Sequence, residues 1–325
     1  MNRKSPAIIV AKFISNLPFQ IFHPLEGLVL NLFPLRKRSY QLFLLAIPRS
    51  GSTLAHQCLV NYFSLSYLTN IGHVFYKLPF FGGVFSIFLT SFFGRSSTFT
   101  SQEGFISGFN SPSEGLLFWN WWMNFGLEDC FKVNKVASKM KAKESYFINV
   151  IIKLSSLFSP FSSSYLGHTL DPDRLYSHFP NAIYVRLRRD PVLNAMSLLE
   201  CLRRDNRSWF SLVPRECFPD LHSSTEFEKV ASQVYWLNKR LDDSLVNKNC
   251  LHINYEDLCS NPRVVMQCVS RYAESHGLYL KQNLHVPISF SSKSLESYSS
   301  SDVTSVRCCI KRLERLHGPL SSAVI

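Results

Sequence analysis

Three short, mainly apolar runs, each followed by a turn and then by a helical pattern, constrain the fold of this chain most strongly. The runs are residues 41–47, 182–185 and 251–255. Runs without polar alternation are typical of strands that are buried on both faces. Such strands, alternating with helices, predict a parallel sheet covered by helices. We therefore expect an α/β fold, for which 325 residues are enough to build one large domain.

The predicted organisation is an apolar, basic N-terminal segment over residues 1–39 and a single domain over residues 40–325. Within that domain an insert over about residues 69–165 is aromatic and Ser-rich, and we expect it to be helical or irregular. Inserts of this kind often build substrate pockets. Its three clustered tryptophans could contact a substrate or belong to the core; they are Trp119, Trp121 and Trp122.

Two segments raise the question of membrane contact. The first 35 residues are apolar and basic, and residues 78–94 carry no charge but include Pro79 and two glycines. Neither contains an uninterrupted run of the roughly 18 apolar residues that a spanning helix needs. The N-terminal pattern predicts peripheral contact with the cytoplasmic face of a membrane. The alternative is that both segments are buried packing elements.

The charge and the cysteines narrow the class of protein. The net charge of +12 favours anionic partners. Nucleic-acid binding is not expected, because the basic residues are spread and not arranged in an aromatic-laced stripe. Nine cysteines without a C-x-x-C pair argue against a disulfide scaffold and a structural zinc site. We expect a cytoplasmic location, and the sequence predicts no oligomeric state.

The turn after the first apolar run has the composition of an anion-binding loop. It lies between a predicted strand and a predicted helix, where backbone N–H groups and the helix dipole favour an anion. Arg49 is expected to supply a cation and to act on the group being transferred. Ser50, Ser52 and Thr53 are expected to donate from their hydroxyl groups, and Gly51 is the glycine of the predicted binding loop.

The same loop departs from the nucleoside-triphosphate pattern G-x-x-x-x-G-K-[ST]. Ala46 stands where that pattern has its first Gly, and Ser52 stands where it has Lys. That Lys neutralises the β- and γ-phosphates, so its loss suits a ligand with fewer charges there. A P-loop nucleotide kinase or NTPase remains the alternative, weakened further because no convincing magnesium-binding acid follows a second strand.

A second predicted anion site follows the second apolar run. Arg189-Asp190-Pro191 ends that run, and Ser197 follows eight residues after Arg189 on the next predicted helix. An arginine and a hydroxyl that face one helix end would form a compact phosphate clamp. Four further arginines lie nearby and are expected to be solvated: Arg186, Arg188, Arg203 and Arg204.

These segments together resemble sulfotransferases that use 3′-phosphoadenosine 5′-phosphosulfate (PAPS), in their bacterial form. The loop resembles the family's 5′-phosphosulfate loop, and Arg189 with Ser197 resembles its 3′-phosphate motif at the family's spacing. Residues 254–262 resemble a third segment that usually shapes the sheet. The resemblance implies a P-loop-like fold and sulfuryl transfer from PAPS to a hydroxyl or amine without a metal. A glycan and a lipid are candidates for the unidentified acceptor.

Three residues compete for the role of the base that accepts the acceptor's proton. His168 lies 21 residues before Arg189, where the family often places a histidine, and it is the first choice. Glu114 precedes a run of aromatics, where similar enzymes have Pro-x-Glu, and it is a close second. His73 follows the loop helix, where some relatives carry a glutamate. The alternative for His73 is an ordinary core or surface histidine. The alternative for Glu114 is an acid that stabilises the first turn of a helix.

Overall fold

The computed structural model of the chain describes residues 18–33, 40–94, 99, 106–124, 138–217 and 224–321. Its centre is a five-stranded sheet with the order β2-β3-β1-β4-β5, in which every neighbouring pair is parallel. The strands are β1 (Gln41–Leu45), β2 (Ser66–Tyr67), β3 (Phe161–Ser163), β4 (Ile183–Arg188) and β5 (Leu251–Asn254). The predicted α/β fold with a parallel sheet is therefore confirmed.

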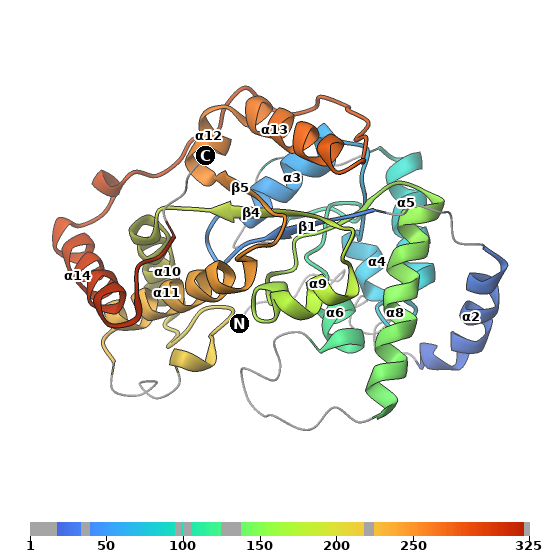
Figure 1. Ribbon diagram of the computed structural model, residues 1–325, viewed down its shortest axis with the longest axis horizontal. Coiled ribbons are helices and arrows are strands. Elements are labelled where there is room, and N and C mark those ends of the chain that lie inside the picture. The colour runs from blue at the N-terminus through green and yellow to red at the C-terminus, as the bar shows by residue number, and fades with distance from the viewer. Residues whose placement is uncertain are drawn as a thin grey trace, which may run out of the picture.

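Helices cover both faces of this sheet (Figure 1). The α-helices are α2 (His23–Leu32), α3 (Ser52–Tyr62), α4 (Asn70–Val74), α5 (Pro79–Phe92), α6 (Leu116–Met123), α8 (Ser138–Leu157), α9 (Pro172–His178), α10 (Pro191–Asp205), α11 (Glu226–Leu245), α12 (Tyr255–Ser260), α13 (Pro262–Ser275) and α14 (Ser300–His317). Short 3-10 helices are η1 (Phe19–Phe22), η2 (Leu166–Thr169), η3 (Arg215–Cys217) and η4 (Leu295–Ser297).

The apolar character of β1 follows from its two buried faces. Leu42 and Leu44 join a core with residues of α3, α12 and α13, whereas Phe43 and Leu45 join a core with residues of α6, α8, α10, α11 and α14. Successive residues of a strand point to opposite faces, so a central strand covered on both sides is apolar at every position. All five residues of β1 are buried.

The helices after β1, β4 and β5 begin close to where the sequence places them. Asn261 caps α13, accepting a hydrogen bond from the Val264 N–H group, and Pro262 is the first residue of that helix. Asp190 caps α10 in the same way, accepting from Leu193 N–H. One boundary differs from the prediction, because Tyr255 is the first residue of α12 and not the last residue of a strand.

The insert between β2 and β3 contains helices and irregular stretches in its described parts, as the sequence predicts. It contributes α4, α5, α6 and α8. Trp119 and Trp122 of α6 are buried in the core, and Trp121 packs partly against it. None of the described helices has both the length and the apolar composition needed to cross a membrane.

Candidate active site

The predicted loop and clamp lie at one edge of the sheet. The loop follows β1, Arg189 follows β4 and Tyr255 follows β5, each directly after its strand or within a few residues of it. Because the strands are parallel, these carboxyl ends meet along one edge, where α/β proteins usually bind their ligands. Residues far apart in the sequence therefore surround one site.

Side chains hold the backbone of the loop between β1 and α3 in place. Four successive carbonyl oxygens each accept a hydrogen bond from a side chain. The pairs are Ala46 with Thr169 (2.8 Å), Ile47 with Ser50 (2.7 Å), Pro48 with Asn194 (2.8 Å) and Arg49 with Arg189 (2.7 Å). The first N–H groups of a helix have no carbonyl partner within the helix, so the N-terminus of α3 favours an anion in front of the loop.

Two residues of the loop have left-handed backbone conformations. Gly51 has a φ of 95° and Arg49 has a φ of 64°. Glycine adopts this region freely, but an arginine there costs energy, about 1–3 kcal/mol for a strained residue. The hydrogen bond from Arg189 to the Arg49 carbonyl helps to hold this conformation. Strain of this kind is typical of ligand-binding loops.

The structure brings the two predicted anion sites together. Arg49 Nε donates a hydrogen bond to Ser197 Oγ at 3.3 Å, which joins the loop after β1 to the helix after β4. The Arg189 guanidinium lies 4.7 Å from the centre of the Tyr255 ring. Two arginines, a helix N-terminus and a buried serine thus converge, an arrangement suited to a ligand with more than one phosphate or sulfate group.

Tyr255 is a part of the site that sequence reasoning missed. Its segment was assigned only to the sheet, yet its ring contacts both Arg189 and the loop glycine. A Cβ on Gly51 would lie 2.3 Å from two carbons of this ring, so only glycine fits there. Burial raises the pKa of Tyr255 to about 12. The signal that could have found it is an aromatic residue directly at the carboxyl end of a parallel strand.

The hydroxyl groups of the loop have different surroundings. Ser50 is fully buried and donates to Ile47 O, so its proton is used inside the loop. Ser52 is the first residue of α3 and is 6% exposed, whereas Thr53 is half-buried. The last two hydroxyls therefore lie at the helix N-terminus, where a ligand anion would bind.

Glu114 is held at the carboxyl end of β2. Pro112 pairs with Thr69 just after that strand, and Ser113 N–H donates to Leu68 O at 2.8 Å. The Glu114 side chain is half-buried, and no hydrogen bond or ion pair links it to another residue in the described part of the chain. Burial raises its pKa to about 7. A carboxyl group with this pKa can accept or release a proton near neutral pH.

His73 holds the turn that carries Glu114. Leu117 N–H donates to His73 Nε2 at 3.0 Å, and His73 Nδ1 lies 3.0 Å from Ser113 Oγ. Since Nε2 accepts a hydrogen bond, the ring is neutral, and Nδ1–H donates to the serine. Burial lowers the His73 pKa to about 4, which agrees with the neutral form. Both ring nitrogens are thus engaged in positioning α6.

His168 lies in η2 and is fully buried among aromatic rings. It is 0% exposed, and its ring contacts Phe43, Trp119 and Tyr165 edge-on at centroid distances of 5.4, 4.4 and 5.3 Å. Burial lowers its pKa to about 3. This environment is that of a core residue, because a proton acceptor must be reachable by its substrate.

The arginines of β4 are not solvated as expected. Arg186 is 1% exposed and Arg188 is 9% exposed, and both pair with Asp242 of α11, Arg188 at 2.9 Å. Asp242 also accepts a hydrogen bond from the Ser321 N–H group at 3.0 Å. The expectation is wrong for these two because a buried acid from a distant helix compensates them. Arg203 and Arg204 are exposed as predicted.

A pocket of about 240 Å³ lies beside Arg189. Asp190, Pro191, Asn254 and Glu256 contribute to its lining, so it opens at the carboxyl ends of β4 and β5. The C-terminal part of the chain adds Tyr298, which is near enough to Arg49 and Arg189 for their charges to act on its hydroxyl, although burial raises its pKa. The binding edge is therefore bounded by segments from both halves of the chain.

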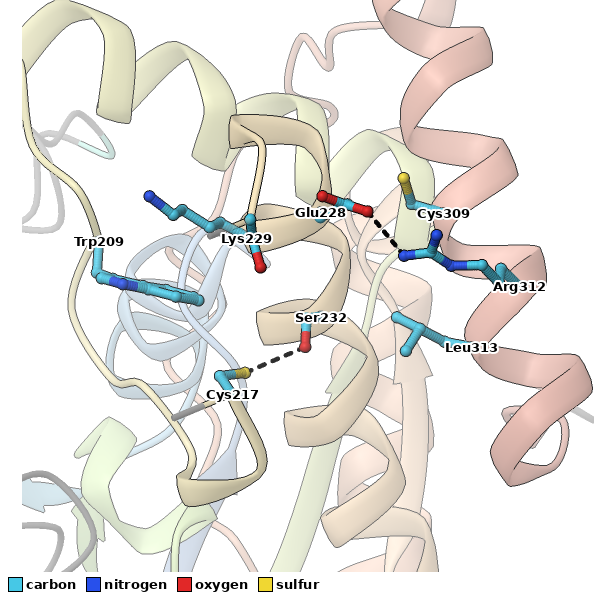
Figure 2. Close-up of a pocket in the computed structure, with 9 residues that line it drawn as sticks. Trp209, Cys217, Glu228, Lys229, Ser232, Cys309, Arg312 and Leu313 are labelled. Atoms are coloured by element: carbon cyan, nitrogen blue, oxygen red, sulfur yellow. Dashed lines mark hydrogen bonds and ion pairs between the residues drawn. The ribbon is translucent and has the colours of Figure 1, made fainter. Parts of the chain in front are cut away.

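A second pocket, of about 250 Å³, lies away from this edge, between η3, α11 and α14 (Figure 2). Its lining includes the ion pair of Glu228 with Arg312 at 2.8 Å and the contact of Cys217 Sγ with Ser232 Oγ at 3.3 Å. None of its lining residues belongs to the loop or to a strand end. Across the described ranges no three His, Cys, Asp or Glu side chains are grouped so as to hold a metal ion.

Comparison with known proteins gives a family match. A model described as the sulfotransferase family matches residues 41–275 of this chain. That range spans the whole sheet and includes every candidate site residue named above from Arg49 to Tyr255. None of the curated proteins compared with the chain matches it.

Two solved structures show the same fold. Sulfotransferase STF9 from Mycobacterium avium is 13% identical with a TM-score of 0.52, and the match covers 96% of this chain and 76% of that one. Sulfotransferase STF1 from Mycobacterium tuberculosis H37Rv is 13% identical with a TM-score of 0.51, covering 94% and 83%. At this identity the likeness concerns the fold.

Proposed function

This chain belongs to the sulfotransferase family, and on that premise we propose that it transfers a sulfuryl group from PAPS to a hydroxyl or amine of an acceptor. Membership of the family selects this activity over the nucleotide-kinase alternative. The presence of Ser52 in place of the phosphate-binding lysine agrees with that choice.

One observation carries the choice of donor: the loop after β1 and the clamp after β4 are in contact. PAPS has a phosphosulfate at one end and a 3′-phosphate at the other. The N-terminus of α3 with Arg49 suits the phosphosulfate, and Arg189 with Ser197 suits the 3′-phosphate. The contact of Arg49 with Ser197 at 3.3 Å keeps the two subsites close enough for one nucleotide.

The proposed reaction exchanges one sulfur–oxygen bond for another. The bond between sulfur and the 5′-phosphate oxygen breaks, and a bond between sulfur and the acceptor oxygen forms. The leaving group is adenosine 3′,5′-bisphosphate, and the acceptor's proton passes to a protein base. Arg49 stabilises the negative charge that develops on the departing phosphate, since a cation there acts more strongly as charge grows.

We assign the base to Glu114 in preference to His168 and His73. Glu114 is half-buried and has a pKa near 7, so its carboxylate can reach a substrate and accept a proton. His168 is enclosed by aromatic rings, and His73 uses both nitrogens to hold the protein together. Glu114 is held beside the carboxyl end of β2, and β2 lies two strands from β1, a spacing of about 10 Å across the sheet.

Calorimetry tests the donor assignment directly. We expect PAPS and adenosine 3′,5′-bisphosphate to bind at least about tenfold more tightly than ATP, a difference of about 1.4 kcal/mol. Equal affinities for PAPS and ATP would contradict the assignment of the two subsites. Transfer of label from radiolabelled PAPS should continue in the presence of a chelator, because Arg49 and the N-terminus of α3 supply the positive charge that a metal would otherwise provide at the phosphosulfate.

A further inference from the structure

Two neighbouring helices expose a row of large apolar side chains. On α2 these are Leu25, Leu28 and Leu32, which are 54%, 61% and 70% exposed. On α5 they are Phe85, Phe88 and Phe92, which are 37%, 59% and 73% exposed. Each set follows the spacing i, i+3, i+7 and therefore lies on one side of its helix. We call these six residues the α2–α5 face. Apolar surface of this kind is rare on proteins that have no partner.

The α2 helix packs against the protein through a buried acid, whereas an ordinary surface helix packs through its apolar side. Glu26 is 0% exposed and accepts hydrogen bonds from the N–H groups of Phe80 (2.8 Å) and Phe81 (2.9 Å) at the start of α5, and from Tyr146 Oη (2.6 Å). A surface helix normally buries its apolar side and exposes its acids. Here the acid is buried and most of the apolar residues face outward.

Two further polar contacts fix α2 in this orientation. Lys153 Nζ of α8 donates to Leu30 O at 2.6 Å, and His23 Nε2 donates to Lys77 O at 2.6 Å. Figure 1 shows α2 at the outer edge of the molecule, beside α8. The leucine side of α2 is thus held outward by contacts from both α8 and the segment before α5.

The sequence that flanks these two helices selects an anionic bilayer as the occupant. Arg36, Lys37 and Arg38 follow the end of α2 within six residues, and Arg95 follows the end of α5 within three. Between Glu26 and Glu103 the sequence contains no Asp or Glu. A strongly apolar face whose flanking sequence is basic and free of acids fits the interface of an anionic membrane, which rewards both properties.

Exposed rings lead from this face toward Glu114. The ring centroids of Phe88 and Phe92 are 6.0 Å apart, those of Phe92 and Phe93 are 5.0 Å apart, and those of Phe93 and Phe109 are 5.5 Å apart. Phe109 is 50% exposed, and its carbonyl accepts from Ile71 N–H in α4.

Two further exposed apolar residues lie close to the candidate base along the chain. Leu116 and Leu117, which closely follow Glu114, are 51% and 45% exposed. An apolar molecule lying along these side chains would have its polar end beside the Glu114 carboxylate. The geometry therefore favours an acceptor with an apolar body and a hydroxyl group at one end.

We propose that the α2–α5 face docks on an anionic lipid bilayer and that the acceptor is a lipid hydroxyl, which reaches Glu114 along the exposed phenylalanines. The second half of this proposal rests on the proposed function. The sulfuryl group would pass from PAPS to the lipid oxygen, with the lipid's proton going to Glu114, while the apolar part of the lipid stays in contact with the face.

Vesicle flotation tests the docking without any donor. The wild-type chain should float with vesicles of equal parts phosphatidylcholine and phosphatidylglycerol and bind pure phosphatidylcholine more weakly. The triple variant Leu28→Ser, Phe88→Ser, Phe92→Ser should lose about tenfold or more in binding, because three exposed apolar contacts are removed. Its affinity for PAPS should be unchanged.

The matched control is Leu316→Ser on α14, at the opposite end of the molecule (Figure 1), where the leucine is 68% exposed. It should bind vesicles like the wild type. Equal vesicle binding by the triple variant would overturn the docking proposal. A different result would identify another occupant. If the wild type does not bind vesicles and forms a dimer, and the triple variant is a monomer, the face is an interface with a second copy of the chain.

The acceptor class is tested with radiolabelled PAPS and a cell extract divided into a lipid fraction, presented in the same vesicles, and a water-soluble fraction. We expect label in the lipid fraction, reduced by the triple variant and retained by Leu316→Ser. Label only in the water-soluble fraction, or no labelled lipid although PAPS binds, overturns the lipid acceptor. Failure to bind PAPS in calorimetry would contradict the proposed function but would not affect the conclusion drawn from vesicle flotation.

Discussion

The ring of Tyr255 occupies the space that a side chain on Gly51 would need. A Cβ at position 51 would lie 2.3 Å from two of its ring carbons, well inside van der Waals contact. Tyr255 also lies under the guanidinium of Arg189, whose Nη1 donates to Arg49 O at 2.7 Å. The ends of β1, β4 and β5 are therefore coupled through one tyrosine and one arginine.

Replacing Gly51 should disrupt this coupling. In Gly51→Ala the new methyl group pushes on the ring and the backbone must keep a φ of 95°, so we expect a loss of about 1–3 kcal/mol in the free energy of unfolding. Donor affinity should fall as well. Gly27→Ala is the control: nothing lies within 4 Å of its Cβ in α2, and alanine should stabilise that helix by up to about 1 kcal/mol. Urea unfolding and calorimetry measure both effects.

Arg189→Ala should weaken PAPS far more than adenosine 5′-phosphosulfate, which lacks the 3′-phosphate. A charge-assisted contact contributes about 1.5–3 kcal/mol, or roughly 10- to 150-fold in affinity. Arg204→Ala is the matched control, because that arginine is exposed on α10 and pairs with its neighbour Asp205. Equal losses for the two nucleotides would remove Arg189 from the 3′-phosphate subsite.

Arg49→Ala should lower turnover more than donor affinity. In the proposed reaction Arg49 lies beside the departing phosphate, so its contribution would grow as negative charge develops in the transition state. Steady-state rates and donor titrations on the same preparations separate the two. Normal kcat with only a raised KM would mean that Arg49 binds the donor and does no more.

Glu114→Gln should lower turnover roughly 10²–10⁴-fold while donor binding stays near normal. Because the Glu114 pKa is about 7 and the base must be ionised, kcat/KM of the wild type should rise with pH and level off above about 7. A variant that keeps its rate and the same pH profile would show that another group accepts the proton.

The Glu114→Gln substitution should also change the stability of the protein, and this effect can be measured without a substrate. The folded state raises the Glu114 pKa from 4.5 to about 7, so over that interval the folded chain holds a proton that the unfolded chain has released. Glu114 therefore lowers the free energy of unfolding as pH rises from 4.5 to 7. The difference between wild type and Glu114→Gln in urea unfolding should follow this trend and be flat outside it.

His168→Phe should keep most of the activity, since phenylalanine can replace an imidazole that is packed among aromatic rings. The folded state lowers the His168 pKa from 6.5 to about 3, so the unfolded chain binds a proton below pH 6.5 that the folded chain does not. Wild-type stability should fall as pH drops through that range, and the variant should unfold at a lower pH. An inactive but folded variant that binds PAPS would return the role of base to His168.

Local sequence patterns were sufficient to predict most of the fold and some of the residues of the candidate site. The strand, loop and helix over 41–62 and the spacing of Arg189 and Ser197 depend on neighbouring residues, and the sequence shows them directly. The position of Glu114 depends on the pairing of Pro112 with Thr69 across the insert. That pairing is set by tertiary contacts, so the sequence pattern alone could not place Glu114 beside the carboxyl end of β2.

Long-range packing explains what sequence reasoning missed. Tyr255 joins the site because β5 lies beside β4, and Arg186 and Arg188 are buried because Asp242 of α11 meets them there. Each partner lies more than fifty residues away along the chain. The sequence alone predicts solvated arginines there, because a run of basic residues is usually exposed to solvent.

The cluster of Asp242 with Arg186 and Arg188 also makes the binding edge depend on a buried acid that lies outside it. Asp242 of α11 pairs with both guanidinium groups and accepts a hydrogen bond from Ser321 N–H at 3.0 Å. Removing one partner of a buried ion pair is strongly destabilising, because the remaining charge is left uncompensated. The strand that ends at Arg189 is therefore stabilised by a helix and a C-terminal segment that need not touch the ligand.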